Sequence, residues 1–155
     1  MIYLAGPCSP EHRTMMVAIG KFLREQLKYE VFCPFELKIE NAWDYTQDEW
    51  SWLVFQKDIE AIDNSDIMVS ISTGRISSGG TNWEQGYAYG KGKKDNIFVF
   101  QITNKPTSVM TKNGCAVFVN TNKKEILDSI RMVFEYYENG KIEELKYRPC
   151  TTVLT

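Results

Sequence analysis

Histidine is almost absent from this chain, and so is any apolar run long enough to cross a membrane. Only one of the 155 residues is histidine, and the four cysteines are scattered without C-x-x-C spacing. A Cys/His zinc site cannot be assembled from such a set, so no metal site is predicted. The N-terminus also lacks the basic segment and apolar stretch of a secretion signal. We therefore expect a cytoplasmic protein with no membrane segment.

A strong excess of charge of either sign is missing as well. The formal net charge is -2 and the sequence pI is about 5.5, so no positive field exists to hold nucleic acid or an acidic membrane surface. The Walker A loop, the G-x-G-x-x-G dinucleotide loop and the G-x-S-x-G nucleophile elbow are not found. These absences favour a small-molecule or protein partner over nucleic acid.

One compact domain over residues 1–155 is predicted, because the chain is long enough for one core but too short for two. Five short apolar runs are typical of buried strands, and four longer segments have helical character. The strands are expected at 2–5, 31–33, 67–71, 97–100 and 116–119, and the helices at 11–28, 48–63, 81–90 and 123–137. This alternation predicts an α/β fold, with a five-stranded parallel sheet flanked by helices in a flavodoxin-like or Rossmann-like three-layer sandwich. Residues 141–155 are interpreted as a polar C-terminal tail.

In such folds ligands bind beyond the carboxyl ends of the strands, where the strand order switches. The first strand is followed by Gly6, whose missing side chain allows a ligand to approach the backbone. An ordinary strand-to-helix turn would have the same sequence. The segment after the third strand is polar and glycine-rich up to Gly80 and then runs into a helix. It is the more informative of the two strand ends.

A glutamate, Glu84, falls in the first turn of that helix if the helix begins between Gly79 and Thr81. The positive N-terminal end of the helix dipole favours the ionised carboxylate there. An ionised and positioned glutamate is a nucleophile or a base, although a glutamate at this place can also serve helix stability alone. Gly86 and Gly90 argue against stability as its only task, since a glycine inside a helix costs about 1 kcal/mol relative to alanine.

A second carboxylate, Asp58, lies in the preceding helix together with Glu60 and Asp63. A solvated acidic helix face is one interpretation of this pattern. The other is that Asp58 meets Glu84 at the strand ends, because two carboxylates are the usual equipment for cleaving a glycosidic bond. The four tryptophans could stack on a base or pack within the protein.

Three blocks of the chain resemble the nucleoside 2-deoxyribosyltransferase family, over nearly the whole length up to about Val119. Residues 2–7 (IYLAGP) look like the first strand and turn of that family, and Asp58 followed by residues 65–68 (SDIM) looks like its passage into the third strand. The most specific block, residues 80–88 (GTNWEQGYA), is similar to the family signature G-T-A-x-E-x-G-Y-A. Residues 105–110 form a weaker fourth match.

The resemblance implies that Glu84 attacks the anomeric carbon of a nucleoside and forms a covalent glycosyl-enzyme, from which 2-deoxyribose passes to another nucleobase. It implies that Tyr3 holds Glu84 in place and that Asp58 exchanges a proton with the base. No cofactor is implied. Family members are homo-oligomers whose active sites borrow residues from a neighbour, and Ser108 and Met110 would be the borrowed residues here. Gly6, Ser78 and Gly80 would also line the substrate site.

Two departures from the family pattern leave the substrate open. Ser78 stands where the transferases have an aspartate that binds a sugar hydroxyl, and Ser108 stands where they have asparagine. Loss of the acid removes a charge that would repel a phosphate. Both changes resemble the related 2'-deoxynucleoside 5'-monophosphate N-glycosidases, so a hydrolase is the alternative to a transferase. A non-catalytic nucleotide sensor is a third possibility, because flavodoxin-like folds also host binding modules.

Overall fold

A computed structural model describes residues 1–74 and 79–146 of the chain. Five strands form one sheet in the order β2-β1-β3-β4-β5, and every neighbouring pair is parallel. The strands are β1 (Ile2–Ala5), β2 (Val31–Phe32), β3 (Ile67–Ser72), β4 (Ile97–Gln101) and β5 (Val117–Asn120). The predicted five-stranded, flavodoxin-like parallel sheet is therefore confirmed. Its strand order switches between β1 and β3, where this class of sheet opens a ligand crevice.

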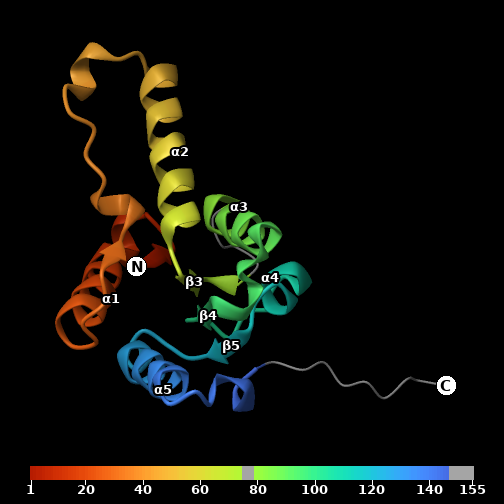
Figure 1. The fold of residues 1–155 in the computed structure, drawn as a ribbon. Helices are drawn as coiled ribbons and strands as arrows, with labels where there is room; N and C mark the ends of the chain where they lie inside the picture. The colour runs from red at the N-terminus through yellow and green to blue at the C-terminus, as the bar shows by residue number, and fades with distance from the viewer. Residues whose placement is uncertain (75–78, 147–155) are drawn as a thin grey trace.

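Helices cover both faces of the sheet (Figure 1). They are α1 (Arg13–Glu25), α2 (Gln47–Asn64), α3 (Gly79–Ala88), α4 (Val109–Asn113) and α5 (Ile126–Glu138), joined by short 3-10 turns such as Pro10–His12 and Pro34–Glu36. On one face α1 and α5 pack against β1, β3 and β4 in the larger apolar cluster. On the other face α2 and α3 pack against the same strands in a smaller cluster that contains the buried ring of Tyr3.

Two helices differ from the sequence prediction. The helix predicted to run to residue 90 ends at Ala88, and a wide turn over Tyr89–Lys93 follows, in which Gly92 has a φ of 82°. No helix was predicted around Ser108 and Met110, yet Val109–Asn113 forms the short helix α4. The Ser108 side chain caps this helix by accepting a hydrogen bond from the Met110 backbone N–H. A single turn of helix is too short to leave a periodic pattern in the sequence.

The helix α2 extends well beyond the body of the protein (Figure 1). A capping box between Thr46 and Glu49 fixes its first turn, and its only buried residues are Ala61 and Ile62 near its C-terminal end. Asp58 therefore precedes the segment of α2 that is buried against the sheet. Within the part of the chain that the structure describes, no helix has the length and apolar character needed to span a membrane.

Candidate active site

The hydroxyl of Tyr3 donates a hydrogen bond of 2.8 Å to Glu84 Oε1. Tyr3 lies in β1, and the alternation of side chains along the strand turns its ring toward the face covered by α2 and α3. The ring is fully buried and stacks on Phe32, with 5.6 Å between the ring centroids. Burial and the neighbouring carboxylates raise the pKa of the Tyr3 phenol far above its usual value. The phenol therefore stays protonated and remains a donor to Glu84.

Burial raises the pKa of Glu84 to about 7. The hydrogen bond from Tyr3 opposes this change because it stabilises the carboxylate, whereas the nearby charge of Asp58 adds to it. The helix α3 begins at Gly79, so Glu84 lies in its second turn and not in its first turn as predicted; the first turn contains no acidic residue. A carboxylate that ionises near neutral pH and is held by a rigid donor is suited to act as a nucleophile or as a base.

Asp58 and Glu84 line one cavity of about 510 Å³, so the structure brings the two predicted carboxylates together. Burial raises the pKa of Asp58 to about 6. Its Oδ1 atom is buried and accepts no hydrogen bond from any described residue. An orphaned buried acceptor of this kind needs a donor, and a bound molecule is the natural source. The interpretation of Asp58 as part of a solvated acidic face is thus not supported.

The remaining walls of this cavity are mostly apolar and come from α2 and α3. Besides the two carboxylates, the cavity is lined by Ser51, Val54, Phe55, Ile59, Ile62, Gly79, Gly80 and Trp83. Phe55 was missed by the sequence analysis, and Trp83 was only one of four candidate stacking residues. The signal for Phe55 was its spacing, because a position three residues from Asp58 shares a helix face with it. Trp83 directly precedes Glu84, and helix spacing gives no such signal for it.

A second, smaller cavity of about 80 Å³ adjoins the first at Glu84 and Gly80. Gly6 and Cys8 line it from the end of β1. A Cβ atom at Gly6 would lie 2.5 Å from Met16 Cε and 3.2 Å from Ile71 Cβ, so packing beneath the loop excludes a side chain. The sequence prediction that Gly6 and Gly80 border the ligand crevice agrees with this geometry.

Cys8 also lines a third cavity, of about 360 Å³, at the ends of β1, β3 and β4. Its walls include the polar side chains of Ser9, His12 and Lys123. Ser9 Oγ and His12 Nδ1 are 2.8 Å apart. The second cavity shares Gly80 and Glu84 with the first and Cys8 with the third, so the three cavities are neighbours.

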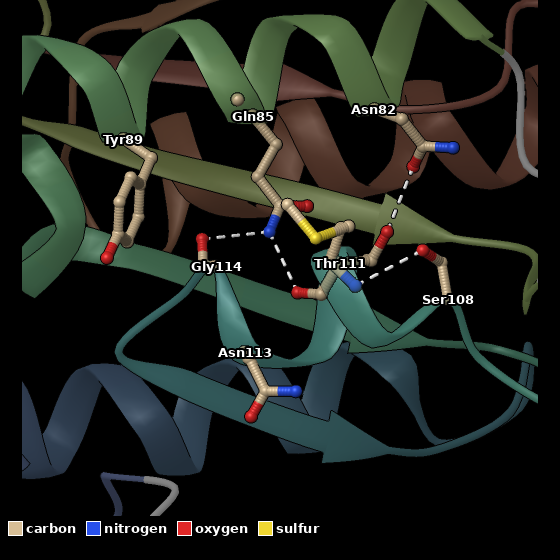
Figure 2. Close-up of a pocket in the computed structure, with 9 residues that line it drawn as sticks. Asn82, Gln85, Tyr89, Ser108, Thr111, Asn113 and Gly114 are labelled. Carbon is tan, nitrogen blue, oxygen red and sulfur yellow. Dashed lines mark hydrogen bonds between the residues drawn. The ribbon is translucent and has the colours of Figure 1, made fainter.

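Ser108 and Met110 lie elsewhere. They line a separate cavity of about 370 Å³ between α3 and α4, which Figure 2 shows, and neither residue borders the cavities that contain Glu84. Met110 is 79% exposed. Within one chain, therefore, these two residues are not part of the Glu84 site. Ser78, the other serine of the predicted substrate site, falls outside the described residues, as does most of the tail predicted at 141–155.

No cluster of three or more His, Cys, Asp or Glu side chains that could hold a metal ion is present in residues 1–74 and 79–146. The fold and the site together define a flavodoxin-like α/β protein with a paired-carboxylate crevice at the switch point of its sheet. The chain belongs to the nucleoside 2-deoxyribosyltransferase family, since the sequence model of that family matches residues 2–138. This is a family of glycosyl-transferring enzymes.

Solved structures agree with this assignment. One is a 2-deoxyribosyltransferase from the psychrotolerant bacterium Bacillus psychrosaccharolyticus, with a TM-score of 0.66 and 26% identity over 82% of this chain and 90% of that chain. Another is a conserved protein from Enterococcus faecalis V583, with a TM-score of 0.57 and 18% identity over 84% of this chain and 96% of that chain. The second likeness concerns the fold alone. None of the curated proteins compared with this chain matches it.

Proposed function

We propose that this protein is a nucleoside 2-deoxyribosyltransferase in which Glu84 is the nucleophile. The observation that carries the proposal is the Tyr3–Glu84 hydrogen bond at the edge of a cavity that also holds the unpartnered oxygen of Asp58. Cleavage of an N-glycosidic bond requires a nucleophile and a group that protonates the leaving base. Glu84, held by a fixed donor, and the carboxyl group of Asp58 beside it can fill these two roles.

In the first step the Glu84 carboxylate forms a bond to the anomeric carbon of a 2'-deoxynucleoside, and the bond from that carbon to the base nitrogen breaks. The electron pair of the broken bond stays on the base, and protonated Asp58 donates its proton there, so the base leaves as a neutral molecule. Tyr3 keeps Glu84 in position for this attack. The apolar cavity lined by Phe55 and Trp83 offers planar side chains against which the base can stack.

In the second step another nucleobase enters and its nitrogen attacks the anomeric carbon of the glycosyl-enzyme. The bond to Glu84 breaks, its electrons return to the carboxylate, and Asp58 accepts the proton that the incoming base releases. Two displacements retain the configuration of the sugar. No cofactor takes part in either step.

Base exchange tests this proposal directly. The protein is incubated with thymidine or deoxyinosine and excess adenine, and the products are separated by chromatography. We expect deoxyadenosine to form with the wild-type protein and to be absent with Glu84→Ala. Full activity of Glu84→Ala would overturn the role of Glu84, and a wild-type protein without exchange on any deoxynucleoside would overturn the transferase.

A hydrolase acting on 2'-deoxynucleoside 5'-monophosphates is the second candidate. The cavity near Lys123, which shares Cys8 with the small cavity beside Glu84, favours it, because Lys123 and the Ser9 hydroxyl could bind a phosphate at the far end of the sugar. In this reaction water takes the place of the second base. Free base released from monophosphates, and not from nucleosides, would identify the hydrolase; the same assay with Lys123→Ala would then show a raised KM.

We also propose that the protein works as a homo-oligomer whose sites are shared. Ser108 and Met110 line the side of α3 that faces away from Asp58, and the strongly exposed Val109 and Met110 present an apolar surface. Gln85 lines the same cavity, and its buried Oε1 has no donor among the described residues. A second copy seated there would cover the apolar surface and could supply that donor.

Subunit complementation tests the sharing. Glu84→Gln and Met110→Glu are each expected to be inactive or nearly so. When the two variants are mixed and allowed to exchange subunits, a mixed oligomer contains sites with both native residues, and activity should return. If sedimentation shows that subunits have exchanged and the mixture still has no activity, the sites are not shared.

A further inference from the structure

The side chain of Gln85 bridges α3 to α4 with two hydrogen bonds. Gln85 is 3% exposed. Its Nε2 atom donates two hydrogen bonds of 2.9 Å, one to the carbonyl of Thr111 and one to the carbonyl of Gly114 (Figure 2). Both carbonyls are at the end of α4, where a helix leaves its last carbonyls without partners in the helix itself. The amide orientation follows from the contacts, because the opposite assignment would face the Gln85 oxygen toward two other acceptors.

The helix α3 depends on such connections because its own sequence supports it weakly. It begins with Gly79 and Gly80, contains Gly86, and ends in the irregular turn of Tyr89–Lys93. Each interior glycine costs about 1 kcal/mol relative to alanine. The rotation of α3 about its axis is therefore set by the neighbours that hold its side chains rather than by the stiffness of the helix.

Two neighbours hold adjacent residues of α3 from different directions. Tyr3 on β1 holds Glu84, and the end of α4 holds Gln85. Successive side chains on a helix point about 100° apart, so the two connections together fix the helix against rotation. A carboxylate lies roughly 6 Å from a helix axis, so a rotation of about 10° would move it by about 1 Å. A displacement of that size can cost ~100-fold in rate.

We infer that Gln85 is a positioning residue that sets the orientation of the Glu84 carboxylate through the double hydrogen bond to α4. Gln85 lines a different cavity from Glu84 and does not border the crevice in which the reaction is proposed to occur. Gln85 affects the distance between the Glu84 carboxylate and the anomeric carbon, and the strength of the Tyr3–Glu84 hydrogen bond. The inference rests on the proposed role of Glu84 as the nucleophile.

The test replaces Gln85 by methionine, an apolar side chain of similar length that fits a buried site but has no hydrogen-bond donor. Thr111→Val is the matched control: it removes a weaker hydrogen bond of 3.3 Å between α4 and Asn82 and leaves both bonds of Gln85, which go to backbone carbonyls, in place. Base exchange is measured with the folded variants across pH, with thymidine as donor and adenine as acceptor. We expect Gln85→Met to lower kcat by 10-fold to 100-fold with less than a threefold change in the KM of thymidine, and Thr111→Val to keep the wild-type kcat.

The pH profile separates positioning from a general loss of stability. A looser Tyr3–Glu84 hydrogen bond stabilises the carboxylate less, so the pH below which activity is lost should move upward in Gln85→Met. Gln85→Glu is a second variant in case the methionine variant does not fold; its protonated carboxyl can donate to only one of the two carbonyls, and an intermediate kcat is expected. A folded Gln85→Met or Gln85→Glu with wild-type kcat and an unmoved pH limit would overturn the inference. Activity that survives in Glu84→Ala would instead overturn the proposed function, so the two failures are distinguishable.

Discussion

The phenol of Tyr3 reaches across the sheet-to-helix interface to Glu84, and the 2.8 Å hydrogen bond joins residues that are 81 positions apart in the sequence. Because the Tyr3 ring is fully buried, the position of its hydroxyl is determined by the core rather than by solvent-exposed loops. The Glu84 carboxylate is thus held by a side chain of the buried core. This arrangement satisfies the need for a catalytic group to be held in place before the substrate arrives.

Replacement of Tyr3 by phenylalanine removes the donor and keeps the ring that packs on Phe32. Hydrogen bonds to charged groups contribute about 1.5–3 kcal/mol, so we expect kcat for base exchange to fall by roughly 10-fold to 100-fold. The pKa of Glu84 should rise further, since the Tyr3 bond is what lowers it. The kcat of Tyr3→Phe measured from pH 5 to 9 checks both effects; an unchanged profile would show that the hydrogen bond does not act on the nucleophile.

The pH dependence of the wild-type protein follows from the two carboxyl groups. With pKa values of about 6 for Asp58 and about 7 for Glu84, a single proton is held by the pair mainly between these values. The proposed first step needs one ionised and one protonated carboxyl, whichever group carries the proton most of the time. We expect kcat/KM to be greatest between pH 6 and 7 and to fall on both sides, by loss of the nucleophile at low pH and loss of the acid at high pH.

Replacement of Asp58 by asparagine should lower the rate of base exchange most for donors whose base must be protonated to leave. An ordinary base leaves as an anion unless it is protonated, and we expect at least a 100-fold loss of kcat for deoxyinosine. A 7-methylated 2'-deoxyguanosine already carries a positive charge on its base and leaves as a neutral molecule. Its rate should fall by less than 10-fold in the same variant. Chromatography of the products measures both rates. Equal losses of rate for the two donors would argue that Asp58 does not transfer the proton.

The stacking surface beside the carboxylates can be tested at Trp83, which is 51% exposed and lines the large cavity. One of its neighbours is Tyr87, whose ring lies nearly parallel to it at 5.5 Å. Removing an aromatic stacking partner weakens base binding by about 1–3 kcal/mol in other nucleotide sites. We expect Trp83→Leu to raise the KM for adenine by about 5-fold or more. Trp43→Leu is the control, because Trp43 is fully exposed; a matching change in both variants would exclude a specific contact.

Much of this site could be predicted from sequence because local patterns specify it. The five apolar runs mark the strands, and the glycines before Glu84 mark the start of its helix, although Glu84 lies one turn further into that helix than predicted. That Asp58 meets Glu84 could not be derived from spacing, since the two residues come from separate helices and their meeting depends on how α2 crosses the end of the sheet. The role proposed for Gln85 was invisible for the same reason, because its partners are backbone carbonyls of a one-turn helix that leaves no sequence pattern.

The cost of keeping Glu84 buried gives a prediction about stability that does not depend on any substrate. Its pKa is about 7 in the folded protein, against an ordinary value of 4.5. The folded state therefore binds a proton more tightly than the unfolded chain, so stability falls as the pH rises from about 4.5 to about 7 and the carboxylate must ionise in its buried position. Glu84→Gln keeps an oxygen that can accept from Tyr3 and removes the charge.

We expect Glu84→Gln to be more stable than the wild-type protein above pH 7, on the order of 2 kcal/mol after allowance for the partial exposure of the site. The difference should shrink as the pH is lowered and be small at pH 4.5, where wild-type Glu84 is protonated in the folded state and about half protonated in the unfolded chain. Chemical denaturation of both proteins at pH 4.5, 6 and 8 measures this difference. A constant gap at all three pH values would mean that the substitution acts through packing, and that burial does not hold the proton on Glu84.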